Sequence, residues 1–351
     1  MAELRILNSL LHDVFVVDII YSMVWSERHG EAGELELKVP LEYSLSPHVA
    51  VNNYISKNDT EQVMIIEDIS PLFDEEFGDS LVIKGHTCDI LLDRRVPLDI
   101  FNINGSVQSA CLSLIEDNIV NPANSKRVIQ AFTYMINPDV TITAVDQFTS
   151  GTLYEIISSV AATNGLGFKV SLVDFSLVFS FYKPKDRSSE QFTNPPVIFS
   201  REFDNVLNSK YEYITNGSKN ATLVIVEDEI PSLQRTMVFV GSEPEGLDRR
   251  ETYSEQSITR TVSGEDDLTD GEVSTVIFYK GVEQLADLQP ILVFDGQFVT
   301  DVQFVFGTDF FLGDLVQCVI QGHDVPARAV EYVHSIEGDG EAKYVSFDFV
   351  L

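Results

Sequence analysis

The chain has 351 residues, of which 55 are acidic and 23 are basic, so its net charge is −32, while 44% of its residues are hydrophobic. A folded protein with this balance has a broadly anionic surface, which excludes binding to nucleic acids or anionic membranes, because both require lysine and arginine to replace the counterions of phosphate groups. The hydrophobic fraction excludes long disordered stretches, and the length predicts two or three domains.

Residues 1–97 are predicted to form a first antiparallel β-barrel. Residues 14–20 are almost continuously apolar, and residues 33–40 alternate between apolar and charged side chains, as in a strand with one buried face. Residues 62–69 and 80–83 are typical of a strand pair joined by an acidic connection. Short strands at regular spacing, without a helical pattern, indicate an antiparallel barrel or sandwich.

Residues 98–200 are predicted to form a small α/β domain. Its expected elements are a helix near 107–119, a helix near 152–164 and a hairpin over 168–182. Thr152 and Glu155 have the spacing of a capping box, in which each side chain satisfies a free backbone N–H of the first helical turn.

Residues 201–351 are predicted to form a second β-barrel with a polar and helical insertion near 242–290, in which a short helix is expected around residues 282–288. The acidic segment 266–271 resembles a calcium-binding loop, but Leu268 stands where a ligand is needed, so a solvated turn is the better interpretation. The expected strands of this region cover residues 221–226, 235–240, 298–306, 315–320, 328–336 and 344–351.

A weak internal similarity links the two ends of the chain. Residues 64–69 align without gaps on residues 328–333, with Glu67 on Glu331. In the same alignment, Leu81 and Ile83 fall on Val345 and Phe347. A duplicated hairpin and a chance similarity between two hairpins both explain this pattern.

The sequence predicts no catalytic, cofactor-binding or metal site, and therefore no enzyme. The nucleophile, zinc-protease, phosphate-loop and dinucleotide signatures are absent, and the six histidines are dispersed. The cysteines Cys88, Cys111 and Cys318 are far apart and are expected to be buried thiols. We expect no signal peptide and no membrane insertion by this chain.

The tetrapeptide Leu-Asp-Arg-Arg occurs twice, ending in Arg94 and Arg95 and again in Arg249 and Arg250. In a chain with so few cations, these four arginines are candidates for interface residues, placed opposite carboxylates at domain or subunit borders. Two exposed turns explain the repeat equally well.

Several strings, taken in order, resemble the tail-tip hub proteins of long-tailed siphophages, also called baseplate hub proteins. The pattern Tyr-x-Gly-x-Asp-Arg of that family occurs here as residues 182–187, with Pro184 in place of glycine. The other matching strings cover residues 20–28, 31–37, 64–67, 84–95, 199–200, 205–207, 219–221, 246–251 and 310–316.

This resemblance implies two related antiparallel β-barrels, a small α/β domain and an insertion, assembled as a pseudo-sixfold trimeric ring. It implies a structural hub, a homotrimer located in the virion at the tail tip and assembled in the bacterial cytoplasm. The implied partners are a distal tail ring protein, the tail tube or tape-measure protein, and a tip, fibre or receptor-binding protein. During genome ejection, DNA is expected to pass through without specific binding. The chain lacks the C-terminal extension that carries a peptidase or fibre in many relatives, so no lytic activity is expected.

Two alternatives remain open from the sequence. A carbohydrate-active hydrolase or binding module at the tail tip would use two carboxylates across a cleft, and an acidic β-protein has many to offer. An adaptor of a related contractile injection machine would use the same barrels.

Overall fold

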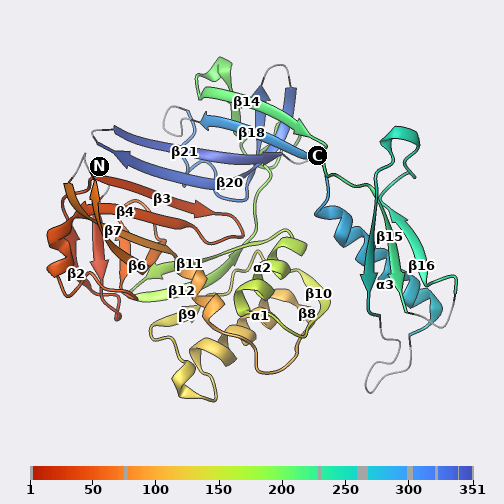
Figure 1. Cartoon of the computed structure of the whole chain (residues 1–351), viewed down its shortest axis with the longest axis horizontal. Coiled ribbons are helices and arrows are strands. Elements are labelled where there is room, and N and C mark those ends of the chain that lie inside the picture. Colours follow the sequence, from red (N-terminus) through yellow and green to blue (C-terminus); the bar gives the residue numbers. More distant parts are fainter. Residues whose placement is uncertain are drawn as a thin grey trace. The chain divides into compact units, whose positions relative to one another are not determined.

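The computed structural model describes residues 3–74, 78–227, 231–258, 268–298, 303–320, 323–338 and 340–349. The chain divides into two compact units (Figure 1). Unit 1 consists of Met1–Ser209 and Asp295–Leu351, and unit 2 consists of Lys210–Phe294. The chain is mainly β, as the sequence predicts.

One large sheet contains most of the strands. Its main path runs in the order β14-β18-β21-β20-β3-β4-β7-β6-β5-β1-β2, and β19 pairs with both β20 and β13. These strands are β1 (Leu4–Leu7), β2 (Asp13–Val17), β3 (Ser22–Arg28), β4 (Glu34–Pro40), β5 (Tyr54–Lys57), β6 (Val63–Asp74), β7 (Gly78–Thr87), β13 (Ile198–Ser200), β14 (Val206–Ile214), β18 (Ile291–Phe298), β19 (Leu315–Ile320), β20 (His323–Glu337) and β21 (Gly340–Phe349).

The prediction of two closed barrels was wrong about closure. In the described residues, the strand path stays open and the two ends of the chain share one sheet. The hairpin β3–β4 lies in the middle, because β4 pairs with β7 on one side and β3 pairs with β20 on the other. Figure 1 shows this arrangement as blue C-terminal strands beside red N-terminal ones. The C-terminal hairpin therefore extends the N-terminal sheet instead of closing on itself.

The two hairpins of the internal similarity, β6–β7 and β20–β21, lie on opposite sides of β3–β4. Each contains a bulge, between Ile66 and Asp68 in β6 and between Ala329 and Glu331 in β20. Their cross-strand registers differ, because Ile69 pairs with Ile83 whereas the aligned Val333 pairs with Tyr344. The two hairpins thus flank β3–β4 and each contains a bulge, but their strands pair in different registers.

The middle of unit 1 carries the expected α/β elements. The capping box of Thr152 and Glu155 is present at the start of α2. Helix α1 continues as a turn of π-helix over Glu116–Val120. The elements are β8 (Phe101–Ser106), α1 (Val107–Ile115), β9 (Phe132–Tyr134), β10 (Thr143–Phe148), α2 (Leu153–Thr163), β11 (Gly167–Val173) and β12 (Ser176–Tyr182). The domain boundaries at residues 97 and 200 stay a prediction.

Short 3-10 helices connect several of these elements. They are η1 (Leu41–Leu45), η2 (Cys88–Arg94), η4 (Ser125–Arg127) and η5 (Arg201–Phe203) in unit 1, and η6 (Gly246–Asp248) in unit 2.

Two hydrophobic cores among the described residues of unit 1 follow from its local patterns. One lies under the large sheet, where the alternation of β4 buries Leu35, Leu37 and Val39 around Trp25. The other packs α1 and α2 against β11 and β12. The cysteines Cys88, Cys111 and Cys318 are free and buried, as expected.

Unit 2 is a three-stranded sheet covered by one helix. The sheet has the order β16-β15-β17, with β15 (Ala221–Val226), β16 (Arg235–Phe239) and β17 (Glu251–Gln256). Helix α3 (Asp270–Ala286) begins with a capping box of Thr269 and Glu272. A Cβ atom at Gly281 would lie 2.6 Å from Val238, so glycine allows the helix to approach the sheet closely.

Two predictions for this region need correction. The strands near 221–226 and 235–240 belong to the small sheet of unit 2 and not to a second barrel. The insertion contains a helix of 17 residues, whereas the sequence predicted a short helix near 282–288. Of the segment resembling a calcium loop, residues 266–267 lie outside the described residues, and Thr269 caps α3. The predicted strand 298–306 lies partly outside them too.

Candidate functional site

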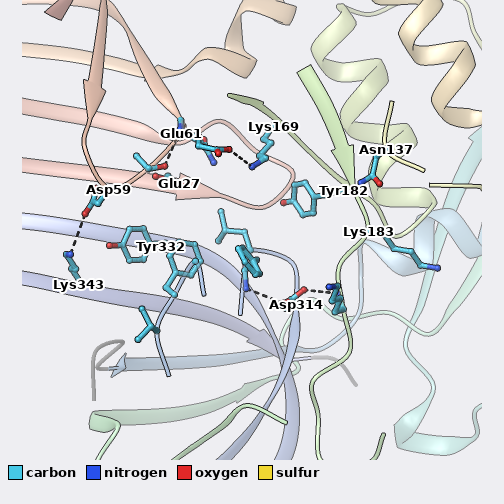
Figure 2. A pocket seen from close by; sticks show the side chains of 18 of the residues that line it. Glu27, Asp59, Glu61, Asn137, Lys169, Tyr182, Lys183, Asp314, Tyr332 and Lys343 are labelled. Carbon is cyan, nitrogen blue, oxygen red and sulfur yellow. Dashed lines mark hydrogen bonds and ion pairs between the residues drawn. The ribbon is translucent and has the colours of Figure 1, made fainter. Parts of the chain in front are cut away.

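Unit 1 contains a cavity of about 850 Å³ that is lined by side chains of both charges (Figure 2). It lies among the loop after β5, the ends of β11 and β12, and the segment before β19. Four of the eleven lysines of the chain line it. The charged lining residues are Glu27, Asp59, Glu61, Asp139, Asp314, Lys169, Lys183, Lys185 and Lys343.

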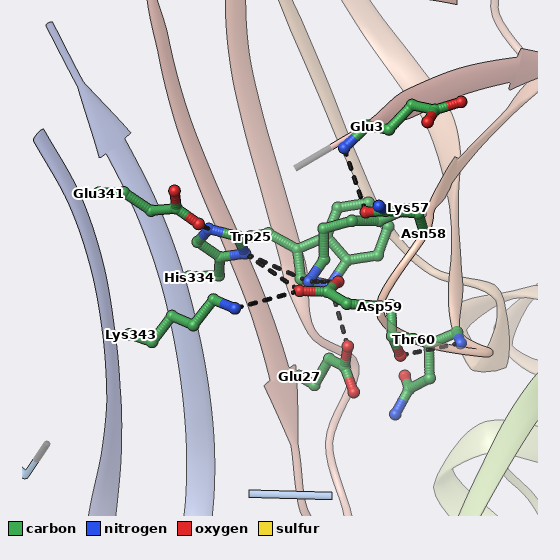
Figure 3. Close-up of polar contacts among 11 residues, drawn as sticks. Glu3, Trp25, Glu27, Lys57, Asn58, Asp59, Thr60, His334, Glu341 and Lys343 are labelled. Atoms are coloured by element: carbon green, nitrogen blue, oxygen red, sulfur yellow. Dashed lines mark hydrogen bonds and ion pairs between the residues drawn. The ribbon is translucent and has the colours of Figure 1, made fainter. Parts of the chain in front are cut away.

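A network of polar side chains at one end of the cavity is centred on Lys57, whose side chain is almost fully buried (Figure 3). Its Nζ donates to Asp59 Oδ1 at 2.5 Å and to His334 Nδ1 at 3.3 Å. The same ammonium group lies 5.3 Å from the centre of the Trp25 ring and 5.8 Å from that of Tyr332, within the range of a cation–π interaction. These contacts join the loop after β5 to strands β3 and β20.

His334 is fully buried, and its neighbours determine its tautomer. An ammonium group only donates, so Nδ1 accepts from Lys57, and Nε2 carries the proton and donates to Glu341 Oε1 at 3.0 Å. Burial lowers the pKa of His334, and the positive charge of Lys57 lowers it further. The ring is therefore neutral and links β20 to β21.

The pKa values of two carboxylates of the cavity, Asp59 and Glu27, are shifted in opposite directions. Burial acts to raise the pKa of Asp59, but the hydrogen bond and charge of Lys57 outweigh it and hold that pKa below its usual value. Lys343 lies 3.4 Å from the same carboxylate. Burial raises the pKa of Glu27, which accepts a hydrogen bond from Trp25 Nε1 at 3.1 Å. An ion-paired Asp59 has no proton to donate.

Asp314 connects two of the strings that resemble hub proteins. Its side chain is buried and accepts from Lys185 N at 2.7 Å and from Arg187 Nε at 2.8 Å. Arg187 belongs to the segment 182–187, and Asp314 to the segment 310–316. The charged pair holds the chain after β12 against the start of β19, and Figure 2 shows Asp314 at this junction.

The replacement of glycine by Pro184 also has a structural consequence at this junction. Gly313 has a φ of +85°, and a Cβ atom there would lie 2.6 Å from the ring of His29 and 2.8 Å from Pro184. His29 Nδ1 lies 2.9 Å from the hydroxyl of Tyr182. Burial, followed by the charge of Arg328, lowers the pKa of His29 to about 4. The site thus packs a proline and a neutral histidine against a glycine.

The first predicted pair of interface arginines lies at the end of η2 in unit 1. Arg94 Nη2 donates to Glu67 Oε1 at 3.0 Å, and its Nη1 donates to Asn52 Oδ1 at 2.8 Å. Arg95 donates to the backbone carbonyls of Arg127 and Arg94, at 2.9 and 2.8 Å. Neither arginine lines the cavity.

The second predicted pair lies after η6 in unit 2. Arg249 forms ion pairs with Glu243 and Glu251, each at 2.5 Å. Arg250 donates to the carbonyl of Thr215 at 2.6 Å and to Ser218 Oγ at 2.7 Å. The structure therefore leaves the two pairs in separate units, and their role as interface residues stays a prediction.

The sequence did not predict the residues that organise the cavity, chiefly Lys57, His334 and the pair of Arg187 and Asp314. Their partners are 277 and 127 positions apart in the chain. The only available signal was indirect, since Arg187 and Asp314 each lie in a segment that resembles hub proteins.

Among the described residues, no group of three or more histidine, cysteine, aspartate or glutamate side chains is placed to hold a metal ion. In the same part of the chain, no helix is long and apolar enough to cross a membrane.

Comparison with known proteins identifies the fold. A family model described as Siphovirus ReqiPepy6 Gp37-like protein matches residues 3–345. The structure is similar to the prophage tail protein gp18 from Listeria monocytogenes EGD-e (14% identity, TM-score 0.58, 99% of this chain and 94% of that chain). It is also similar to the tail protein from Neisseria meningitidis MC58 (13%, 0.62, 99% and 96%) and to the 43 kDa tail protein of prophage MuSo2 from Shewanella oneidensis (11%, 0.60, 98% and 98%). No curated protein matches the chain.

Proposed function

The chain belongs to the Siphovirus ReqiPepy6 Gp37-like protein family, and from this premise we propose that it is the structural hub of a phage tail tip. One observation carries the proposal. The similarity to tail proteins covers 98–99% of this chain and 94–98% of each of those chains. In this proposal, the role of the chain is structural.

In this proposal, three copies form a ring with pseudo-sixfold symmetry. The hairpins β6–β7 and β20–β21 on the two sides of β3–β4 support it, because two related elements in each subunit give six positions in a trimer. One face of such a ring matches a hexameric tail tube or distal tail ring, and the other matches a threefold tip, fibre or receptor-binding protein.

The charge of the chain suits a conduit for DNA. A surface with a net charge of −32 repels phosphate groups, so a genome passes without binding. Tail tube or tape-measure subunits complete the conduit, and the hub is a component of the virion that assembles in the bacterial cytoplasm. An adaptor of an injection machine would differ in its neighbours and not in this fold.

Mass measurement tests the proposal. The purified full chain is mixed with the distal tail ring protein encoded by the same virus, and the complex is weighed by native mass spectrometry. The expected result is three copies of the chain per six ring subunits. A chain that stays monomeric and binds no tail component contradicts the proposal. An image of the particle tip with the chain traced in it gives an independent answer.

A second assay tests the alternative that the chain is a carbohydrate-active hydrolase. The isolated chain is incubated with host cell walls, and soluble sugars are measured. We expect no release, because Asp59 is ion-paired with Lys57 and Lys343. Release that is lost on the change Asp59→Asn would reverse this conclusion.

A further inference from the structure

Three arginines, Arg94, Arg95 and Arg127, lie close together at the C-terminal ends of η2 and η4. Arg95 Nε donates to the carbonyl of Arg127, and Arg95 Nη1 donates to the carbonyl of Arg94. Burial lowers the pKa of Arg95, and the positive charges of Arg127 and Arg94 lower it further. The three cations are therefore close enough to repel one another.

Among the residues that the structure describes, only one of these three cations has a carboxylate partner. Arg94 pairs with Glu67, whereas no carboxylate among the described residues forms an ion pair with Arg95 or Arg127. Arg127 Nη2 donates to the carbonyl of Val96 at 2.6 Å and to Asn118 Oδ1 at 2.9 Å, and its Nη1 is buried without a partner. A cation that lacks a carboxylate and a buried donor that lacks an acceptor are both unfavourable, and a carboxylate supplied from outside relieves the charge repulsion.

Exposed apolar side chains lie in the segment that follows Arg95. Val96 is 53% exposed, Leu98 is 74% exposed and Ile100 is 56% exposed. A groove of about 520 Å³ separates the segment with Leu98 and Ile100 from α1, and Arg127 lines it. Arginine next to exposed apolar groups is the composition of a protein interface. We name Arg95, Val96, Leu98, Ile100 and Arg127 the arginine-apolar surface.

The charge of the whole chain identifies the occupant. Two copies with a net charge of −32 repel each other over most of their surfaces, so self-association is favoured where cations of one copy face acids of the other. The 55 acidic residues of a second copy supply such acids. Nucleic acid is disfavoured by the net charge of the whole chain. Asp99 and Asp117 line the groove and repel carboxylates as well as phosphates, so the acids of a second copy are received at the arginines and not along the groove.

We propose that the arginine-apolar surface binds an acidic edge of a second copy of this chain, with Arg95 and Arg127 receiving its carboxylates and Leu98 and Ile100 covered by the contact. The proposal rests on the proposed ring, because both need self-association. It adds where one subunit touches the next and which chemistry holds the contact.

Charge reversal and charge insertion at exposed positions test this surface. Arg95→Glu removes the cation, and Leu98→Glu places a charge at the centre of the apolar groups. Arg249→Glu is the matched control for the first change, because Arg249 lies in the second copy of the motif and pairs within its own chain. Val145→Glu is the control for the second, since Val145 is 84% exposed elsewhere in unit 1.

The mass of the full chain is measured by light scattering over a range of protein and salt concentrations, alone and with the distal tail ring protein. We expect Arg95→Glu and Leu98→Glu to weaken self-association at least tenfold, and each control to weaken it less than twofold. High salt should weaken the wild-type contact. Urea unfolding shows whether each variant is folded. Leu98→Asn replaces Leu98→Glu if that variant does not fold.

A chemical cross-link gives a second readout. In the variant Arg95→Lys, a carbodiimide joins the new amine to a carboxylate of the neighbouring copy, so the yield of covalent dimer should exceed that of the wild type and of Arg249→Lys. Equal yields, or self-association that neither Arg95→Glu nor Leu98→Glu weakens, overturn the inference and leave the proposed hub intact. A wild-type chain that binds tail proteins but never itself also overturns it. A wild-type chain that binds neither refutes the proposed function as well.

Discussion

The segments Leu92–Arg95 and Leu247–Arg250 have the same four residues, and each overlaps a 3-10 helix, η2 in unit 1 and η6 in unit 2. In unit 2, Arg249 lies between two glutamates. In unit 1, Arg94 has Glu67, while Arg95 faces two backbone carbonyls and two other cations. The difference teaches that the motif itself does not determine the role of its arginines. Their neighbours decide whether the charge is neutralised within the chain or is left for another one.

The largest expected effect concerns Arg187, whose ion pair is more deeply buried than those of Arg94 and Arg249. Arg187 and Asp314 have side chains that are 9% and 4% exposed. Replacing Arg187 by Met leaves a buried carboxylate without its cation, which should lower the free energy of unfolding of unit 1 by about 3–5 kcal/mol. Urea unfolding followed by tyrosine fluorescence measures it. Adding Asp314→Asn should restore part of the loss, and a loss below about 1 kcal/mol would show that the pair is not buried in solution.

His29 shows another way to avoid an uncompensated cation, which is to stay neutral beside Arg328. Its pKa is about 4 when folded, against an ordinary 6.5, because of burial and then of the charge of Arg328. Between pH 6.5 and 4, only the unfolded chain takes up this proton. The free energy of unfolding should therefore decrease as the pH is lowered through this range, by at most about 3 kcal/mol. His29→Gln should flatten this part of the stability curve, measured by unfolding at each pH. An unchanged slope would contradict the assignment.

Lowering the pH also tests the ion pair of Arg94 with Glu67 in the first motif. Burial acts to raise the pKa of Glu67, but hydrogen bonds from His86 and Arg94 outweigh it and lower that pKa. The stability from Glu67 is therefore present above its ordinary pKa and is lost as pH falls through the lower folded value. Glu67→Gln should remove this loss below pH 4.5. Arg94→Gln should remove only part of it, because the hydrogen bond from His86 remains, and the double variant should remove no more than Glu67→Gln alone. Since Glu67 is partly exposed, the effect is smaller than that of His29.

The smallest effects compare the two motifs directly. Arg249→Gln removes two ion pairs and should shift the urea midpoint slightly downward. Arg95→Gln relieves repulsion from Arg94 and Arg127 and should leave the midpoint unchanged or slightly higher. Both differences should fade at high salt, because exposed charges are screened. Shifts of the same sign for the two variants would contradict the comparison.

The parts of the fold that were predicted correctly depend on near neighbours in the chain. The capping box of Thr152 and Glu155 links residues three positions apart, and the burial of Leu35, Leu37 and Val39 follows from the period of a strand. The resemblance to hub proteins, read from short ordered strings, is confirmed at the level of the family. Helix α3 was underestimated, because Gly281 and the few apolar residues of its first turns weaken the helical pattern.

The parts that were missed depend on residues far apart in the chain. The pairing of β20 with β3 joins Glu331 to Arg28, and it decides that the two ends of the chain share one sheet. Strand edges carry the same backbone donors and acceptors whichever partner they take, so no local pattern selects β20 for β3. His334 has neighbours on β5 and β21 that its own strand does not reveal.

By itself, the sequence determined the mainly β character, the helices α1 and α2 of unit 1, the acidic charge and the family, since these depend on composition, on spacing within one element, or on short ordered strings. Only the tertiary structure decided which edges meet and which acid faces which arginine, as Arg94 and Arg95 illustrate. The physical reason is distance along the chain. Local hydrogen bonds and side-chain periods act over a few residues, whereas an ion pair is defined only when the whole fold has brought its two charges together.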